Sequence, residues 1–197
     1  MKDFQNKVAV ITGAGSGIGR ALARDLAAAG ARLALSDVNQ VGLQETADSL
    51  GLGSDRLITE AFDVADRDAF YAFAERVTGH FGAAHLVFNN AGVALGATVE
   101  DMSNEDFEWL MEGGRVSCTS VHPGGIKTNI DRNARMGAGV EKITGDVDKA
   151  RRDFEKMFRT TPEEASQTIL KGVKGNKRRV LIGSDARAID SMQRLMP

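Results

Sequence analysis

Four glycines at alternate positions constrain the start of this chain more than any other feature. They lie in Thr12–Gly19 (TGAGSGIG), which overlaps the end of the apolar run Lys7–Thr12 (KVAVIT). Ile18, Leu22 and Leu26 then recur at every fourth residue, as they do on one face of a helix. A short apolar strand that turns through glycines into a helix is typical of the first unit of a parallel α/β sheet.

The same alternation of strand and helix patterns continues along the chain. Further strands are predicted at Arg32–Ser36, Leu57–Asp63, His85–Asn89, Arg115–His122 and Val180–Ile182. Further helices are predicted at Asn39–Leu50, along a face of Phe70, Phe73, Ala74, Val77 and Phe81 that ends at Gly82, at Ser103–Met111, from Thr161-Pro162 to Lys174, and at Ala186–Leu195. No repeat or linker divides the chain, so we expect one α/β domain over residues 1–197, a doubly wound parallel sheet.

Composition excludes several classes of protein. The chain has 197 residues with 25 Lys and Arg against 27 Asp and Glu, without the basic excess that nucleic acids or anionic membranes require. One cysteine, Cys118, excludes an internal disulfide and a multi-cysteine metal site. No apolar stretch is long enough to span a membrane, and Met1–Val8 has no signal-peptide pattern. We expect a cytoplasmic protein with no metal site and no nucleic-acid or membrane partner.

The position of the glycine loop indicates a phosphate ligand. A helix N-terminus offers unpaired N–H groups and the positive end of the helix dipole. Glycine is required because a Cβ would hold a pyrophosphate away from the backbone. A tight strand-to-helix turn without a ligand is the alternative. Four glycines between a strand and a helix favour a dinucleotide.

Asp37 favours NAD(H) over NADP(H). It lies at the end of the second predicted strand, where a carboxylate can accept hydrogen bonds from both hydroxyls of an adenosine ribose. The same carboxylate repels a 2′-phosphate, and no Arg or Lys follows in residues 38–40. A solvated aspartate at a strand end is the alternative interpretation.

Two more predicted strands end in polar or glycine-containing segments, which would lie at the same edge of the sheet as the glycine loop. Asp63-Val64 follows the third strand, and Asn89–Gly92 (NNAG) follows the fourth. Ligands of open α/β sheets bind outside the carboxyl ends of the strands. Each segment alone is as consistent with a structural turn as with a binding role.

Taken in order, Thr12–Gly19, Asp37, Asp63-Val64, Asn89–Gly92 and Pro123–Thr128 (PGGIKT) resemble the motifs of the short-chain dehydrogenase/reductase family. The resemblance spans nearly the whole chain. It implies a Rossmann-like sheet and an oxidoreductase that transfers hydride between NAD(H) and a small alcohol or ketone. The cofactor-binding residues that it implies are Gly13, Ser16, Gly17, Ile18 and Gly19 at the pyrophosphate, Asp37 at the adenosine ribose, Asp63 and Val64 at the adenine, Asn90, Ala91 and Gly92 along the cofactor, and Pro123, Ile126 and Thr128 at the nicotinamide end.

The catalytic residues of that family have no counterpart here. The family uses a tyrosine for proton transfer, a lysine four residues later, a serine on the preceding strand and an asparagine in the fourth helix. The single tyrosine, Tyr71, has Glu75 four residues later and lies in the third predicted helix. Glu112–Val116 resembles the end of the family's fifth helix entering its sixth strand. The chain is therefore predicted to lack about two strand–helix units, on the order of 60 residues.

Such a gap leaves two arrangements for the sheet, whose order in the family is 3-2-1-4-5-6-7. The strand at Arg115–His122 could move beside the fourth strand, or the gap could remain open and expose strand edges. The usual oligomer contacts of the family would then be lost or rebuilt, so an altered homo-oligomer interface is expected.

The remaining candidates for chemistry are weak. His122 adjoins Pro123 and has Ser120 nearby, but isolated histidines are usually structural. Residues 125–160 correspond to the family's substrate lid. The apolar patch of Phe154, Met157 and Phe158 in this segment indicates either an apolar lining of the lid or ordinary packing.

Three hypotheses follow from these patterns. The chain is a version of an NAD-dependent alcohol or carbonyl oxidoreductase that lacks an internal segment, or a nucleotide-binding or interaction module without chemistry, or an inactive and poorly folded product.

Overall fold

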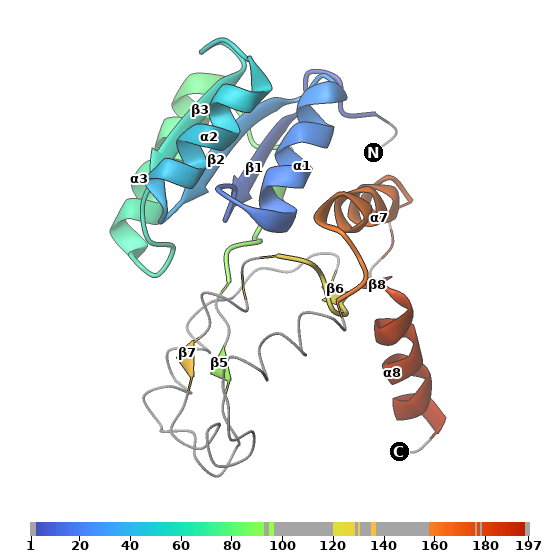
Figure 1. Cartoon of the computed structure of the whole chain (residues 1–197). Helices are drawn as coiled ribbons and strands as arrows, with labels where there is room; N and C mark the ends of the chain where they lie inside the picture. The colour runs from blue at the N-terminus through green and yellow to red at the C-terminus, as the bar shows by residue number, and fades with distance from the viewer. Residues whose placement is uncertain are drawn as a thin grey trace.

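The fold is known from a computed structural model, in which α/β units surround a parallel sheet (Figure 1). It describes residues 3–92, 95–96, 120–128, 130, 135–136, 158–175, 177 and 179–195. No helix among these residues is long and apolar enough to cross a membrane.

The main sheet has four parallel strands in the order β3-β2-β1-β4. They are β1 (Val8–Thr12), β2 (Arg32–Asp37), β3 (Leu57–Ala61) and β4 (Leu86–Phe88). In the register between β1 and β2, Val8 is opposite Arg32 and Thr12 is opposite Ser36. All five residues of β1 are buried, as expected for a central strand covered on both faces.

Helices cover both faces of this sheet and divide the core into two clusters. On one face, Ala9 and Ile11 of β1 belong to a cluster with Leu22 and Leu26 of α1 (Gly17–Ala28). The same cluster includes residues of α2 (Gln40–Leu50) and α7 (Pro162–Lys174). On the other face, Val8 and Val10 pack with buried side chains of α3 (Arg67–Phe81). The doubly wound architecture that the sequence predicts is therefore confirmed.

Capping residues explain where the helices begin and end. The Asn39 side chain accepts the Gly42 N–H at the start of α2, and Asp66 caps α3 in the same way. Thr161 and Glu164 form a complete capping box at the start of α7, followed by Pro162 at the first helical position. The predicted start of α7 at Thr161-Pro162 is confirmed.

The C-terminal strands form a separate sheet. β6 (Ser120–Pro123) pairs in parallel with β8 (Arg179–Ile182), and α8 (Ser184–Leu195) follows. A short parallel pair joins β5 (Leu95–Gly96) to β7 (Arg135–Met136). Among the described residues, no strand pairs with the second edge of β4, whose Val87 is 46% exposed. Of the two predicted arrangements, the described strands adopt the one in which the gap between β4 and β6 remains open.

Packing of α7 against α1 connects the two sheets. The helices lie side by side (Figure 1), and Ala165, Ile169 and Leu170 of α7 belong to the core cluster beneath α1. The fully buried Ser166 donates a 2.7 Å hydrogen bond to the Asp25 carboxylate of α1.

Some details of the sequence prediction are wrong. Ala74 is exposed, because α3 turns only Phe73, Val77 and Phe81 fully inward. β3 ends at Ala61, so Asp63 lies in the loop rather than in the strand. The last helix begins at Ser184, two residues before the predicted start.

Several predictions fall outside the described residues. They are the helix at 103–111, the first part of the strand at 115–119, which includes Cys118, and the side chains of Phe154 and Met157.

Replacing Ser166 by Ala tests the contact between α7 and α1. The variant should lower the free energy of unfolding by about 1–2 kcal/mol, because it removes a buried hydrogen bond to a charged group. Ser191→Ala is the matched control, since the Ser191 hydroxyl only donates within α8. It should change the free energy by less than about 0.5 kcal/mol. Chemical denaturation measures both, and equal effects would mean that the bond between helices adds nothing.

Candidate functional site

The predicted site residues gather where the parallel strands end. Because β1, β2, β3 and β4 are parallel, the loops that follow them emerge at the same edge of the sheet. These loops carry Gly13–Gly19 after β1, Asp37 at the end of β2, Asp63-Val64 after β3, and Asn90–Gly92 after β4.

Hydrogen bonds between Thr12 and Asn90 join the ends of β1 and β4. The buried Thr12 hydroxyl accepts the N–H of Asn90 at 3.1 Å and the N–H of Ala91 at 3.0 Å. The Asn90 side-chain amide donates to the carbonyl oxygens of Thr12 and Gly13, each at 3.1 Å. Asn90 therefore fixes the first turn of the glycine loop.

The glycines of the loop are required by geometry. Gly13 has φ +65° and Gly17 has φ +52°, both in the left-handed region that favours glycine. A Cβ at Gly13 would lie 2.8 Å from Ala91 Cα. A Cβ at Gly19 would collide with the Gly13 carbonyl oxygen and would lie 2.6 Å from the Asn90 amide nitrogen. The loop and the Asn90 turn thus pack without room for side chains.

The N-terminus of α1 has no side-chain cap among the described residues. Side chains cap α2, α3 and α7, whereas Ser16 makes no capping hydrogen bond to α1 within the described residues. The first turn of α1 carries no acidic residue either. A phosphate group fits this end, because it would accept the N–H groups that begin the helix and interact favourably with its dipole.

Asp37 is held beside the glycine loop by two backbone groups. Its carboxylate accepts the Gly15 N–H and the Asn39 N–H, each at 2.8 Å. A Cβ at Gly15 would lie 2.9 Å from the Asp37 carboxylate, so the loop approaches this side chain closely. The side chain is half-buried and its position is fixed before any ligand binds.

Arg20 contacts the same part of the glycine loop as Asp37. Its guanidinium donates to the Gly15 carbonyl, to the Gly42 carbonyl at 3.1 Å and to the Glu45 carboxylate at 3.0 Å. The arginine therefore ties the glycine loop to α2. Its charge is paired with Glu45.

Asp63 and Val64 lie in the loop between β3 and α3. The Asp63 carboxylate accepts the Ala65 N–H at 3.0 Å, which forms a local turn. Asp63 is exposed and Val64 is half-buried.

The segment Pro123–Thr128 is brought from β6 to the glycine loop. The Thr128 side chain touches Gly17, where an added Cβ would lie 3.0 Å from Thr128 Cγ2. Ile126 is buried in the main core cluster and pairs with Thr160 through an isolated β-bridge. Pro123 is exposed at the end of β6. Despite the divided sheet, the segment predicted at the nicotinamide end therefore contacts the glycine loop predicted at the pyrophosphate.

Three residues that support the site were not among the residues predicted from the sequence. Thr12 stands within the glycine motif, so its position could have identified it. Arg20 and Asp185 gave no signal, since neither stands in a recognisable motif. The Asp185 carboxylate accepts the Gly125 N–H at 2.6 Å across 60 residues.

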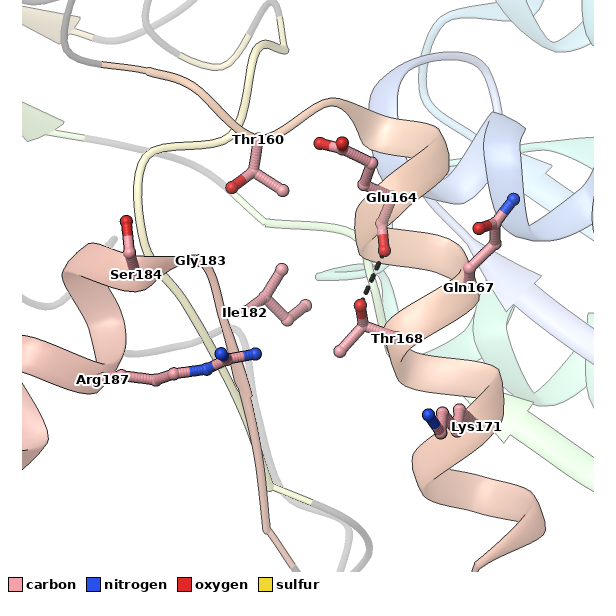
Figure 2. Close-up of a pocket in the computed structure, with 9 residues that line it drawn as sticks. All are labelled: Thr160, Glu164, Gln167, Thr168, Lys171, Ile182, Gly183, Ser184 and Arg187. Carbon is pink, nitrogen blue, oxygen red and sulfur yellow. Dashed lines mark hydrogen bonds between the residues drawn. The ribbon is translucent and has the colours of Figure 1, made fainter.

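A pocket of about 440 Å³ lies between α7, β8 and α8 (Figure 2). Its lining includes Thr168 and Lys171 of α7 and Arg187 of α8. It contains none of the predicted cofactor residues.

Residues suited to acid–base chemistry are not assembled at the site in the described part of the chain. Tyr71 is 58% exposed on α3 and stacks against Arg67, with 5.5 Å from the guanidinium carbon to the ring centroid. His122 is exposed on β6, opposite Leu181. Within the described residues, no three His, Cys, Asp or Glu side chains are grouped to hold a metal ion.

Comparison with known proteins places this arrangement in a family. The family model described as short chain dehydrogenase matches residues 7–113. SadH of Mycobacterium tuberculosis is 35% identical over 270 positions that cover 100% of this chain and 93% of the relative. D-threitol dehydrogenase of Mycolicibacterium smegmatis is 42% identical over 110 residues, which cover 54% of this chain and 42% of the relative.

The fold is shared with solved structures at lower identity. A short-chain dehydrogenase/reductase from Burkholderia phymatum, solved in complex with NAD, superposes with a TM-score of 0.79 at 21% identity. The superposition covers 99% of this chain and 96% of that chain. The architecture is a Rossmann-like fold, and the chain belongs to the short-chain dehydrogenase family.

The comparison with SadH also bears on the predicted gap. Its 270 aligned positions exceed the 197 residues of this chain by 73, so about that many positions have no counterpart here. The family-model match ends at residue 113, beside the point where the sequence predicts the missing block.

Replacing Gly19 by Ala tests the close packing of the loop. The added Cβ would meet the Gly13 carbonyl and the Asn90 amide, so the free energy of unfolding should fall by about 1–3 kcal/mol. Gly79→Ala is the matched control, because Gly79 lies in α3 with no atom within 4 Å of an added Cβ. That control should gain up to about 1 kcal/mol from helix propensity. A Gly19 variant as stable as the control in chemical denaturation would contradict the packing described.

The Asp185 contact predicts a pH dependence. The hydrogen bond from the Gly125 N–H holds the pKa of the Asp185 carboxyl below its ordinary value. Because the folded pKa is the lower one, the carboxylate stabilises the fold above about pH 4. This contribution is lost as pH falls through the folded pKa. Asp185→Asn should therefore show a smaller decline in stability between about pH 5 and pH 3, measured by denaturation at each pH. An unchanged decline would exclude this contribution.

Proposed function

We propose that this chain binds NAD(H) in the crevice at the carboxyl edge of its four-stranded sheet. As a member of the short-chain dehydrogenase family it derives from oxidoreductases that act on alcohols and ketones. We further propose that the 197-residue chain transfers hydride slowly at best, because it carries the cofactor-binding residues without the catalytic ones. The observation that carries this proposal is the joined turn of Thr12, Asn90 and the glycine loop at an uncapped helix N-terminus.

The pyrophosphate of the cofactor would lie over the start of α1. Backbone N–H groups of Ser16, Gly17, Ile18 and Gly19 would donate to it, as at other helix N-termini that bind phosphate. The absence of a Cβ at Gly13 and Gly17 lets Ala91 and Thr128 pack directly against the loop. Asn90, Ala91 and Gly92 would line the next part of the cofactor.

Asp37 supports NAD(H) over NADP(H). Its carboxylate is held in place by Gly15 and Asn39 and carries a negative charge where a 2′-phosphate would lie. Arg20 lies nearby but is paired with Glu45 and two backbone carbonyls, so its charge is engaged within the protein. Asp63 and Val64 would flank the adenine.

The nicotinamide end would meet Pro123, Ile126 and Thr128. Bound NAD(H) supplies the hydride donor or acceptor. Thr128 already contacts Gly17, so this segment closes one end of the crevice. Thr128 and the turn before it would orient the nicotinamide, whereas no described side chain is positioned to exchange a proton with a substrate hydroxyl.

A nucleotide-binding or interaction module without turnover is the second candidate function. It is favoured by the exposed position of Tyr71, which leaves the proton-transfer role of the family without a residue. A small alcohol or ketone would be the substrate of an intact relative rather than of this chain.

Exchanging the charge at the ribose position tests the cofactor assignment. Asp37→Ala combined with Val38→Arg should raise the affinity for NADPH relative to NADH by about ten- to a hundredfold, since it replaces a repelling carboxylate by a cation. Val38 is 72% exposed, so the arginine adds no strain. Val41→Arg is the matched control, because Val41 is equally exposed at 70% on the adjacent helix α2. Fluorescence titration with both cofactors provides the ratio, and an unchanged preference in the double variant would refute the assignment.

Turnover tests the loss of catalysis. With a panel of secondary alcohols and ketones, the rate of NADH formation or consumption should be about 10²–10⁴ below that of an intact family member, the usual cost of losing general acid–base help. Intact mass must first agree with 21.1 kDa, so that a longer protein is not assayed. Full activity at that mass would contradict the proposal.

A further inference from the structure

Asp185 lies outside every motif of the sequence, yet it reaches the segment assigned to the nicotinamide end. It is the second residue of α8 and follows β8 after the turn at Gly183. Its carboxylate accepts the Gly125 N–H at 2.6 Å and the Ala186 N–H at 2.9 Å. One carboxylate oxygen therefore accepts a hydrogen bond from the start of α8, and the other accepts one from the Pro123–Thr128 segment.

The surrounding backbone is built closely around this carboxylate. An added Cβ at Gly124 or at Gly183 would collide with Asp185 oxygens, and Gly183 has φ +94°. Side chains are thus excluded on both sides of the aspartate. The two glycines allow the carboxylate to approach the turn closely. A residue that only capped α8 would not need such close packing.

Two backbone hydrogen bonds fix the same segment on either side of Gly125. The Gly124 N–H donates to the Ile182 carbonyl at 2.8 Å, and the Lys127 N–H donates to the Thr160 carbonyl at 2.9 Å. Gly125 itself is held by the Asp185 side chain. Asp185 is therefore the side-chain member of a set of three contacts that determine where Ile126 and Thr128 lie.

We propose that Asp185 is a positioning residue for the nicotinamide half of the cofactor site, acting through the Gly125 N–H on the Pro123–Thr128 segment. The inference rests on the proposed function. It specifies that the effect is confined to one half of the cofactor. The adenosine and pyrophosphate half is held by the glycine loop and Asp37, and no described contact joins Asp185 itself to either. The segment that Asp185 holds meets this half where Thr128 adjoins Gly17, so a small change in ADP affinity is expected.

Comparing NADH with ADP separates the two halves. Asp185→Ala should raise the dissociation constant for NADH about five- to tenfold, the equivalent of one ordinary hydrogen bond, and change that for ADP by less than about twofold. Asp185→Asn keeps an acceptor oxygen and should recover most of the NADH affinity. Asp190→Ala is the control on the same helix: it breaks the 2.6 Å ion pair with Arg179 and should leave the ratio of the two constants unchanged.

Circular dichroism and thermal unfolding of each variant establish that it is folded. If the alanine variant does not fold, Asp185→Ser replaces it, with the same expected ratio, because serine keeps a polar group at the start of α8 but is too short to reach Gly125. A wild-type chain that does not bind NADH, whether or not it binds ADP, would overturn the proposed function and this inference together. A wild-type chain that binds both, with the Asp185 variants weakening both equally or neither, would overturn this inference alone.

Discussion

The hydrogen bonds between Thr12 and Asn90 are the interaction on which the rest of the site depends. They join the end of the central strand β1 to the end of β4, and the Asn90 amide holds the Gly13 carbonyl. That carbonyl lies where a side chain at Gly19 would have to be, so the first and last glycines of the loop are defined by the same contact. The direction in which α1 leaves the sheet follows from this turn.

The second constraint is how the C-terminal part of the chain returns to this turn without a continuous sheet. The described strands form a four-stranded sheet and two separate pairs, β6–β8 and β5–β7, with the second edge of β4 unpaired among them. Packing of α7 on α1, with the Ser166–Asp25 hydrogen bond, takes over the connection that a continuous sheet would provide. Helix packing therefore places Thr128 against Gly17 although the strands themselves do not adjoin.

Local patterns predict the strand–helix units and most of their ends, because buried strands, glycine turns and capping residues act within a few positions of the sequence. Thr161-Pro162 and Gly82 illustrate this, as both mark helix ends in the structure. Ala74 shows the limit: the apolar pattern places it on the inner face, but in the structure it is exposed while Phe73, Val77 and Phe81 are buried. The choice between two arrangements of the sheet could not be made from the sequence, since it depends on long-range packing.

Some residues of the candidate site could be predicted from the sequence and others could not. The glycines, Asp37 and Asn90 could be assigned because each stands in a recognisable motif at the end of a predicted strand. Arg20 and Asp185 stand in no such motif, so only the structure reveals their contacts with Gly42 and Gly125. The roles assigned to all these residues in binding a cofactor stay predictions, as does the single domain.

Titration of the wild-type chain with NADH is the most direct test of the central claim, that the cofactor half of a short-chain dehydrogenase is complete in this chain. The protein must have the mass of 21.1 kDa and must be folded by circular dichroism. We expect saturable enhancement of NADH fluorescence with one site per chain, displaced by ADP. A folded chain of that mass that shows no saturable binding of NADH would contradict the claim.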